Sequence, residues 1–313
     1  MLQKQLIAFL FGVLFYTGVT AQQDAQYTQY MYNTMAVNPA YAGSRGVLSI
    51  TGLHRSQWLG LDGAPNTQTL NVNTPISERI GVGFSVVNDE IGNGTNQETY
   101  IDGVFSYTVP LSQFAKLSFG VQASAHLLNI DFNQLQNYNN EAQSFGLSNI
   151  DNKFSPNFGA GVYYHTDKFY AGLSVPNFLE TKHFDDSESS NSFLAEERMN
   201  FYLITGYVFD LNRGIKFKPA ALLKAVRGAP LQVDLSTNFM FNDKFILGAA
   251  YRWDATVSAL FAFNISERFM LGLAYDREVS ELGGTRFNNG SFEVLLRYEF
   301  RSKFRRVIEP RFF

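Results

Sequence analysis

Alternation of apolar and polar residues from Val47 to Phe300 limits the possible folds more than any other feature of the sequence. Over residues 117–127 the odd positions are Leu, Phe, Val, Ala, Ala and Leu, and the even positions are Ser, Gly, Gln, Ser and His. The same period of two recurs over residues 80–86 and 291–300. A period of two is typical of β-strands with one apolar face. The sequence therefore predicts an all-β protein.

The pattern predicts about fourteen strands, most of them about ten residues long. They lie near 47–55, 66–74, 79–88, 97–109, 116–129, 155–165, 168–175, 198–209, 215–225, 230–241, 244–252, 255–265, 267–276 and 290–300. Strands of soluble proteins commonly have about five or six residues, whereas a tilted strand needs about nine to eleven to cross a bilayer. The lengths indicate membrane-spanning strands.

Short and long connections alternate along the chain. Tight-turn sequences such as "PISE", "TD", "DLNRG" and "ND" alternate with longer links such as "SQWLGLDGAP" and residues 131–154. A transmembrane β-barrel has short periplasmic turns and longer outer loops. Two links on the outer side, "RGAP" and "DA", are shorter than this rule predicts.

The polarity of the two strand faces favours a barrel over a soluble sandwich. The polar face is rich in Gly, Ser, Asn and Gln and carries Asp234, Glu293, Arg297 and Glu299, while the apolar face of the clearest strands carries no charge. In a membrane barrel the apolar face contacts lipid, and closure removes exposed strand edges. We therefore predict a transmembrane antiparallel β-barrel of about fourteen strands, with a soluble sandwich or propeller as the alternatives.

The beginning of the chain has the pattern of a secretory signal peptide. Lys4 precedes an apolar stretch, and the small residues before Gln22 fit a cleavage site. An uncleaved membrane anchor is the alternative. We expect four parts, which are a signal peptide (1–21), a periplasmic N-terminal segment that is a possible plug (22–46), an outer-membrane barrel (47–300) and a basic periplasmic tail (301–313).

Composition excludes several functional classes. The net charge of -3 argues against a nucleic-acid-binding protein, which is usually basic. The absence of cysteine excludes disulfides, a thiol nucleophile, cysteine zinc sites and a lipoprotein anchor. The acidic residues 183–192 fit either a solvated loop or a calcium site, and we expect no cofactor.

Ser124 and His126 share the polar face of one predicted strand, which suggests either a hydrolase or a hydrated lumen lining. The sequence contains no G-x-S-x-G motif, and we expect that the protein is not an enzyme. Aromatic residues near strand ends fit the interfacial girdles of a barrel. These are Tyr107, Tyr163, Tyr207, Phe209 and Tyr298.

Two motifs near the N-terminus resemble the start of the PorP/SprF family of type IX secretion and gliding-motility membrane proteins. They are "QYMYNTMAVNPAYAG" (29–43) and "LHRSQWLG" (53–60). The resemblance continues through "GLSVPNF", "TGYVFDL", "FKPAALLK", "GAPLQVDL", "DKFILGAAYR", "SFEVLLRYEF" and "PRFF". It covers nearly the whole chain after the signal peptide, and Phe292 departs from it where a more polar residue is expected.

The resemblance implies an outer-membrane barrel of Bacteroidota that serves type IX secretion or gliding motility. Its expected partners are membrane lipid, other type IX secretion components and the C-terminal sorting domain of a secreted surface protein. The family contains core secretion components and partners of a particular adhesin, and the sequence does not separate them. A porin or solute channel is the alternative, since the polar face can line a channel.

The irregular stretch before the first strand supplies the candidate functional residues. We predict that residues 29–43 pack inside the periplasmic mouth of the barrel, with Asn38-Pro39 turning the chain into the first strand, and either close the barrel or bind a partner. The candidate residues are Gln29, Tyr30, Met31, Asn38, Pro39, Ala40, Tyr41, Gly43, Arg55, Gln57 and Trp58.

Overall fold

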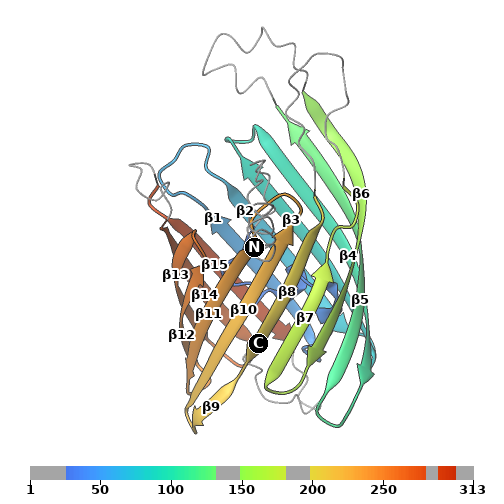
Figure 1. The fold of residues 1–313 in the computed structure, drawn as a ribbon, viewed down its shortest axis with the longest axis vertical. Helices are drawn as coiled ribbons and strands as arrows, with labels where there is room; N and C mark the ends of the chain where they lie inside the picture. The colour runs from blue at the N-terminus through green and yellow to red at the C-terminus, as the bar shows by residue number, and fades with distance from the viewer. Residues whose placement is uncertain (1–25, 132–148, 181–197, 280–287, 301–313) are drawn as a thin grey trace, which may run out of the picture.

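A computed structural model describes residues 26–131, 149–180, 198–279 and 288–300. These residues form a closed antiparallel β-barrel (Figure 1). The predicted signal peptide, the acidic residues 183–192 and the basic tail lie outside the described residues.

The strands agree closely with the sequence prediction. They are β1 (Leu48–Ser56), β2 (Asn66–Pro75), β3 (Ile80–Ile91), β4 (Asn96–Pro110), β5 (Lys116–Ile130), β6 (Ile150–His165), β7 (Phe169–Val175), β8 (Asn200–Tyr207), β9 (Phe209–Asn212), β10 (Ile215–Val226), β11 (Gln232–Phe241), β12 (Phe245–Arg252), β13 (Thr256–Asn264), β14 (Phe269–Glu278) and β15 (Ser291–Phe300). Strand β6 begins five residues before the predicted start at 155, because a bulge at the β5–β6 register shift extends the pairing.

The barrel closes where β1 pairs with β15, in a register that runs from Leu48↔Phe300 to Ser56↔Phe292. We call this pairing the closing seam. Strands β8 and β9 both pair with β10, so they act as one wall strand and the barrel has 14 strands. The predicted single strand 198–209 is therefore interrupted at Val208. We attribute the interruption to Pro219 on β10, which faces it and has no N–H to donate to a carbonyl of this strand. On the opposite side, the Val208 N–H donates to the Lys168 carbonyl, just before β7, at 2.7 Å.

The outer face of the barrel is apolar and the inner face is polar. Large apolar side chains such as Phe84, Phe119 and Phe154 are exposed on the outside, whereas Ser and Asn side chains of the same strands are buried inside. This arrangement reverses that of a soluble protein and suits a lipid-facing wall. The prediction that Tyr163 belongs to an interfacial girdle is wrong, because this side chain is 1% exposed and packs in the lumen against Tyr41.

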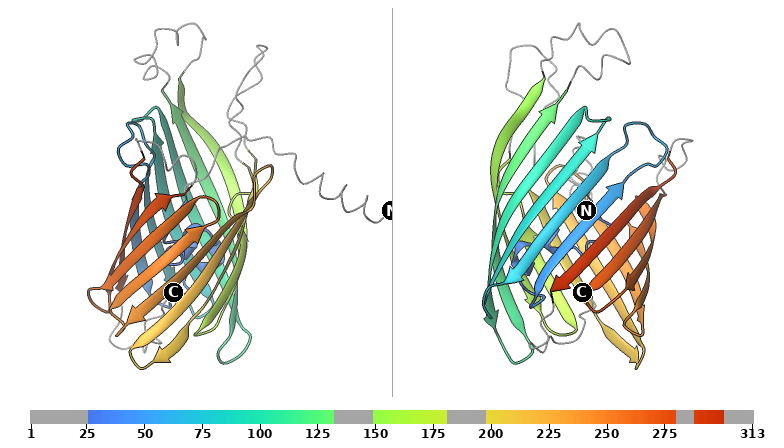
Figure 2. Two further views of the ribbon diagram at one scale, coloured as in Figure 1. Left: turned by 60° about the vertical axis from the view of Figure 1, so that its left-hand side comes forward. Right: turned by 180° about the vertical axis from the view of Figure 1, so that it is seen from behind.

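The two ends of the barrel differ. Turns of two to five residues join the strands at one end, whereas the other end has the nine-residue link 57–65, although its links 92–95, 227–231 and 253–255 are as short as the turns (Figure 2). Short turns face the periplasm in outer-membrane barrels. We refer to the short-turn end and the long-loop end. Within the described ranges, no helix has both the length and the apolar character needed to cross a membrane.

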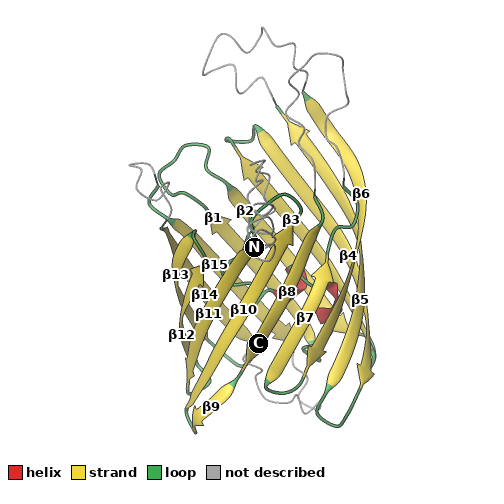
Figure 3. Cartoon of the chain, in the orientation of Figure 1, coloured by secondary structure: helices red, strands yellow, loops and turns green. Residues whose placement is uncertain are grey.

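The core lies inside the barrel and consists of the N-terminal segment, by which we mean residues 26–46, packed against the inner wall. The segment contains two short 3-10 helices, η2 (Thr34–Ala36) and η3 (Pro39–Tyr41), drawn red in Figure 3. Asn38 begins η3, since its side-chain Oδ1 accepts the Ala40 N–H at 2.9 Å and Pro39 supplies a fixed φ. The sequence around Asn38-Pro39 therefore forms a local turn, followed by residues 42–47 that lead into β1.

Candidate functional site

The N-terminal segment runs along the lumen from one end of the wall to the other. The Gln26 side chain donates to Gln232 Oε1 at 3.1 Å, where β11 begins at the long-loop end. Arg45 forms an ion pair with Glu299, one residue before β15 ends at the short-turn end. The prediction that the segment occupies the periplasmic mouth is thus too narrow, because the segment also fills the interior.

Most of the predicted site residues in this segment are buried. Asn38 and Ala40 are 0% exposed and Met31 is 1% exposed, and the remaining ones are buried apart from half-buried Gly43. A docked segment therefore offers these side chains to the barrel wall and not to an external partner. Binding of a partner to them requires that the segment first leave the lumen.

Tyrosine side chains attach the segment to several strands. The Tyr27 hydroxyl and Thr69 Oγ1 on β2 are 2.8 Å apart, and the Lys218 ammonium on β10 lies 4.6 Å from the centre of the Tyr32 ring. Tyr41 packs edge-on against Tyr163 on β6, with ring centres 5.5 Å apart. Burial raises the pKa of Tyr27, Tyr30 and Tyr32 above the ordinary value, so these hydroxyls stay protonated in the docked segment.

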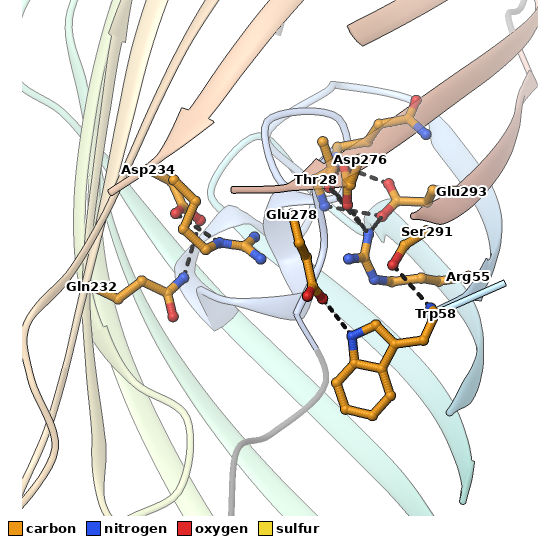
Figure 4. A network of polar contacts seen from close by, with 11 residues as sticks. Thr28, Arg55, Trp58, Gln232, Asp234, Asp276, Glu278, Ser291 and Glu293 are labelled. Atoms are coloured by element: carbon orange, nitrogen blue, oxygen red, sulfur yellow. Dashed lines mark hydrogen bonds and ion pairs between the residues drawn. The ribbon is translucent and has the colours of Figure 1, made fainter. Parts of the chain in front are cut away.

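A buried polar network fixes the beginning of the segment (Figure 4). The N–H groups of Thr28 and Gln29 donate to the two carboxylate oxygens of Glu293 on β15, each at 2.9 Å. The Thr28 hydroxyl donates to Asp276 on β14 at 2.7 Å. Arg55 Nη1 on β1 lies 2.7 Å from Asp276 and 3.1 Å from Glu293.

The charges of this network explain why the segment is needed there. Two carboxylates, Asp276 and Glu293, share one guanidinium, and all three side chains are almost fully buried. Buried charges are tolerated only when hydrogen bonds satisfy them. Thr28 and Gln29 supply such bonds, and successive backbone N–H groups suit an anion. The network therefore joins the segment to three wall strands at once.

Glycines on the wall make room for the backbone of the segment. A Cβ built on Gly120 of β5 would overlap the backbone nitrogen of Ala40, and one built on Gly81 of β3 would overlap the carbonyl of Ala42. The contact is therefore backbone to backbone, and only glycine permits it.

Serine and asparagine side chains donate hydrogen bonds between the segment and β4, β6 and β7, which lie in the same part of the wall as these glycine strands. Ser174 on β7 donates to the Val37 carbonyl at 2.5 Å and Ser106 on β4 donates to the Ala42 carbonyl at 2.7 Å. The Asn38 side chain donates to the Val162 carbonyl at 3.1 Å. Sequence reasoning predicted Asn38 but missed Ser106, Ser174 and the glycines, because small residues on the inner face are equally expected in an open channel.

Gln57 and Trp58 lie apart from the segment, at the long-loop end. The Gln57 N–H donates to the Pro65 carbonyl at 2.9 Å and so closes the β1–β2 link. The Trp58 indole donates to Glu278, and its backbone N–H donates to Ser291 Oγ at 3.3 Å. Of the motif Arg55-x-Gln57-Trp58, only Arg55 joins the segment, while Trp58 holds a loop onto β14 and β15.

The lumen contains a cavity beside the segment. This cavity has a volume of ≈ 90 Å³, and Tyr27, Tyr100 and Tyr202 are among the residues that line it. On the same inner face, His126 stacks on Tyr100 and lies 3.4 Å from Glu98. Ser124 Oγ accepts from Gln122 at 3.0 Å. Among the described residues, no three His, Asp or Glu side chains are grouped so that they could hold a metal ion.

Solved structures with a similar fold include a channel, a transporter and an outer-membrane protein. The TodX deltaS2S3 mutant monoaromatic hydrocarbon channel has a TM-score of 0.50 at 11% identity, over 90% of this chain and 96% of its own. The Ralstonia pickettii toluene transporter TbuX has a TM-score of 0.48 at 10% identity (86% and 93%). Acinetobacter baumannii Omp33 has a TM-score of 0.47 at 10% identity (81% and 98%). At such identities the likeness concerns the fold alone.

The sequence itself matches one described family along most of its length. Residues 19–298 match the family model "Type IX secretion system membrane protein PorP/SprF", and no curated protein sequence matches the chain. The match and the barrel together place the protein in the outer membrane. The family match covers the N-terminal segment, the polar network that binds it and every strand up to β15. The chain therefore belongs to the PorP/SprF family of type IX secretion system membrane proteins.

Proposed function

We propose that the protein helps to export, or to hold at the cell surface, a cargo protein with a C-terminal sorting domain, in type IX secretion or gliding motility. The family membership supports a role in secretion. The observation that carries the proposal is the filled lumen, since the segment is bound to strands on all sides of the barrel. A barrel filled in this way serves better as a scaffold for partners than as a passive pore.

The scaffold role makes the ends of the barrel the contact surfaces for partners. The segment residues are buried, so the groups available to a partner are the links at the long-loop end and the turns at the short-turn end. Outer links contact surface proteins and periplasmic turns contact the secretion components. We propose no catalytic step, and Ser124 and His126 serve as lumen lining. Membranes that contain the Ser124→Ala or the His126→Ala variant should therefore hydrolyse esters at the same rate as membranes that contain the wild-type protein.

The test is deletion of the gene in its native cell, followed by a quantitative census of surface and secreted proteins. We expect at least one large exported protein with a C-terminal sorting domain to disappear from the surface and to return on complementation. An unchanged census would remove the secretion role.

A passive solute channel is the second candidate, and the polar inner face is the observation that favours it. It requires a continuous water-filled path past the segment. Liposomes containing the purified protein would then take up small sugars at a steady rate. We expect no uptake above that of empty liposomes.

A further inference from the structure

Carboxylates that hold the N-terminal segment gather on the last two strands of the barrel. Asp276 lies on β14, and Glu293 and Glu299 lie on β15. Glu293 binds the backbone of Thr28 and Gln29, Asp276 binds the Thr28 hydroxyl, and Glu299 pairs with Arg45. The two ends of the segment are thus both attached to β15.

Two of these carboxylates, Asp276 and Glu293, contact Arg55 on the first strand, β1. Arg55 on β1 and Glu293 on β15 are direct partners in the register of the seam, and their side chains form an ion pair inside the lumen. The segment also leads directly into β1, which begins at Leu48. The segment therefore connects the first and last strands both through the chain and through side chains.

If the barrel closed without the segment, the carboxylates at the seam would lose hydrogen-bond donors. Asp276 and Glu293 would share Arg55 with no donor from Thr28 or Gln29, and like charges that lie close together repel. With the segment in place, each oxygen of Glu293 accepts one backbone N–H, in addition to Arg55. The closed arrangement of β15 beside β1 is therefore stabilised specifically when residues 28 and 29 are present.

We propose that the N-terminal segment has an assembly function, in which it holds β15 in register beside β1 while the barrel closes. Residues at the start and end of the segment, Thr28 and Arg45, supply the contacts to the seam strands. The middle of the segment has contacts of another kind, because Asn38 binds β6 on the far wall through a neutral hydrogen bond. These two groups of contacts can be removed separately.

Cysteine pairs can report on seam formation, since the chain has no cysteine of its own. One pair, His54→Cys with Val294→Cys, spans the closing seam at facing positions. A second pair, Val86→Cys with Ile101→Cys, spans β3–β4 at facing positions and serves as the control. Facing residues of paired strands are close enough for oxidative trapping.

The experiment refolds the full-length chain from urea into detergent micelles and measures how fast each pair is trapped. In the variant Thr28→Ala with Arg45→Ala, we expect trapping of the seam pair to slow about tenfold, because charge-assisted bonds are lost. The β3–β4 pair should change by less than about twofold, and Asn38→Ala should change the seam pair by less than about twofold. Thr28→Ser with native Arg45, which keeps the hydroxyl, should retain the wild-type rate.

Three results would overturn the proposal. Equal trapping of the seam pair in the Thr28/Arg45 variant and the parent would show that closure does not use these contacts. An equal slowing by Asn38→Ala would show that the segment merely fills the lumen. Loss of both cysteine pairs in the Thr28/Arg45 variant would show that it supports the whole sheet and not the seam.

Discussion

Replacing Glu293 with glutamine should loosen the N-terminal segment while the wall of the barrel remains. The side chain is 0% exposed, and its two oxygens accept the N–H groups of Thr28 and Gln29, each at 2.9 Å. Glutamine has the same shape but only one acceptor oxygen. In Glu293→Gln one of the two N–H groups therefore faces an amide NH₂, with no acceptor available.

The expected size of the effect follows from these contacts. A hydrogen bond to a charged group contributes about 1.5–3 kcal/mol, and a buried donor left without a partner costs about 1–3 kcal/mol. Arg55 keeps Asp276 at 2.7 Å, so its charge remains paired. We expect docking to weaken by about 3–4 kcal/mol, which increases the undocked fraction about 10²–10³-fold.

Thiol labelling can measure the undocked fraction directly. Met31 is 1% exposed in the docked segment, so Met31→Cys provides a single buried thiol in a chain without cysteine. Its reaction with a maleimide requires local opening, and the rate therefore follows the undocked fraction. Glu98→Gln on β4 is the matched control, since its carboxylate accepts from Tyr100 at 2.8 Å and lies outside the segment network. A Glu293→Gln rate within about threefold of the parent rate would refute the reasoning, given the 10²-fold minimum expected from the lost bonds.

Gly120→Val should displace the segment at Ala40 and so speed the labelling of Met31→Cys. The barrel wall should stay folded, so the change in gel mobility on boiling should match that of wild type. Gly103→Val is the control and should leave labelling unchanged, because a Cβ has space there. Between pH 8 and about 10, docking should not vary with pH, because the released tyrosines are also neutral there. Above about pH 10, docking should weaken about tenfold per pH unit for each of the three buried tyrosines Tyr27, Tyr30 and Tyr32. The reason is that burial raises the pKa of these hydroxyls only while the segment is docked. Labelling of Met31→Cys between about pH 8 and 11 checks this. Trp58→Phe should remove the indole donor to Glu278 and speed proteolysis within residues 57–65 by about tenfold, with no change in barrel Tm.

Much of the wall could be predicted from the sequence because strand parity is a local property. The alternation over residues 80–86 and 117–127 identified the strands and the lipid-facing side. The same parity places Tyr163 inside, since it lies two residues from Gly161, whose added Cβ would overlap Asn38. The girdle prediction for Tyr163 was wrong because it used residue type and position near a strand end, and did not use parity.

The site could be predicted only in part, because its contacts depend on register between distant strands. Asp276, Glu293 and Arg55 come together only when β14, β15 and β1 are adjacent at the closing seam. The sequence showed Glu293 on the polar face but not its partners. The interruption at Val208 likewise depends on Pro219, a residue of the neighbouring strand.

Conductance of the purified wild-type protein in a planar lipid bilayer tests the central claim most directly. If the N-terminal segment fills the lumen of the membrane-inserted barrel, the bilayer current should stay at its baseline for wild type. Glu293→Gln should then produce intermittent openings, because its segment leaves the lumen more often. A steady open channel in the wild-type protein would contradict the account.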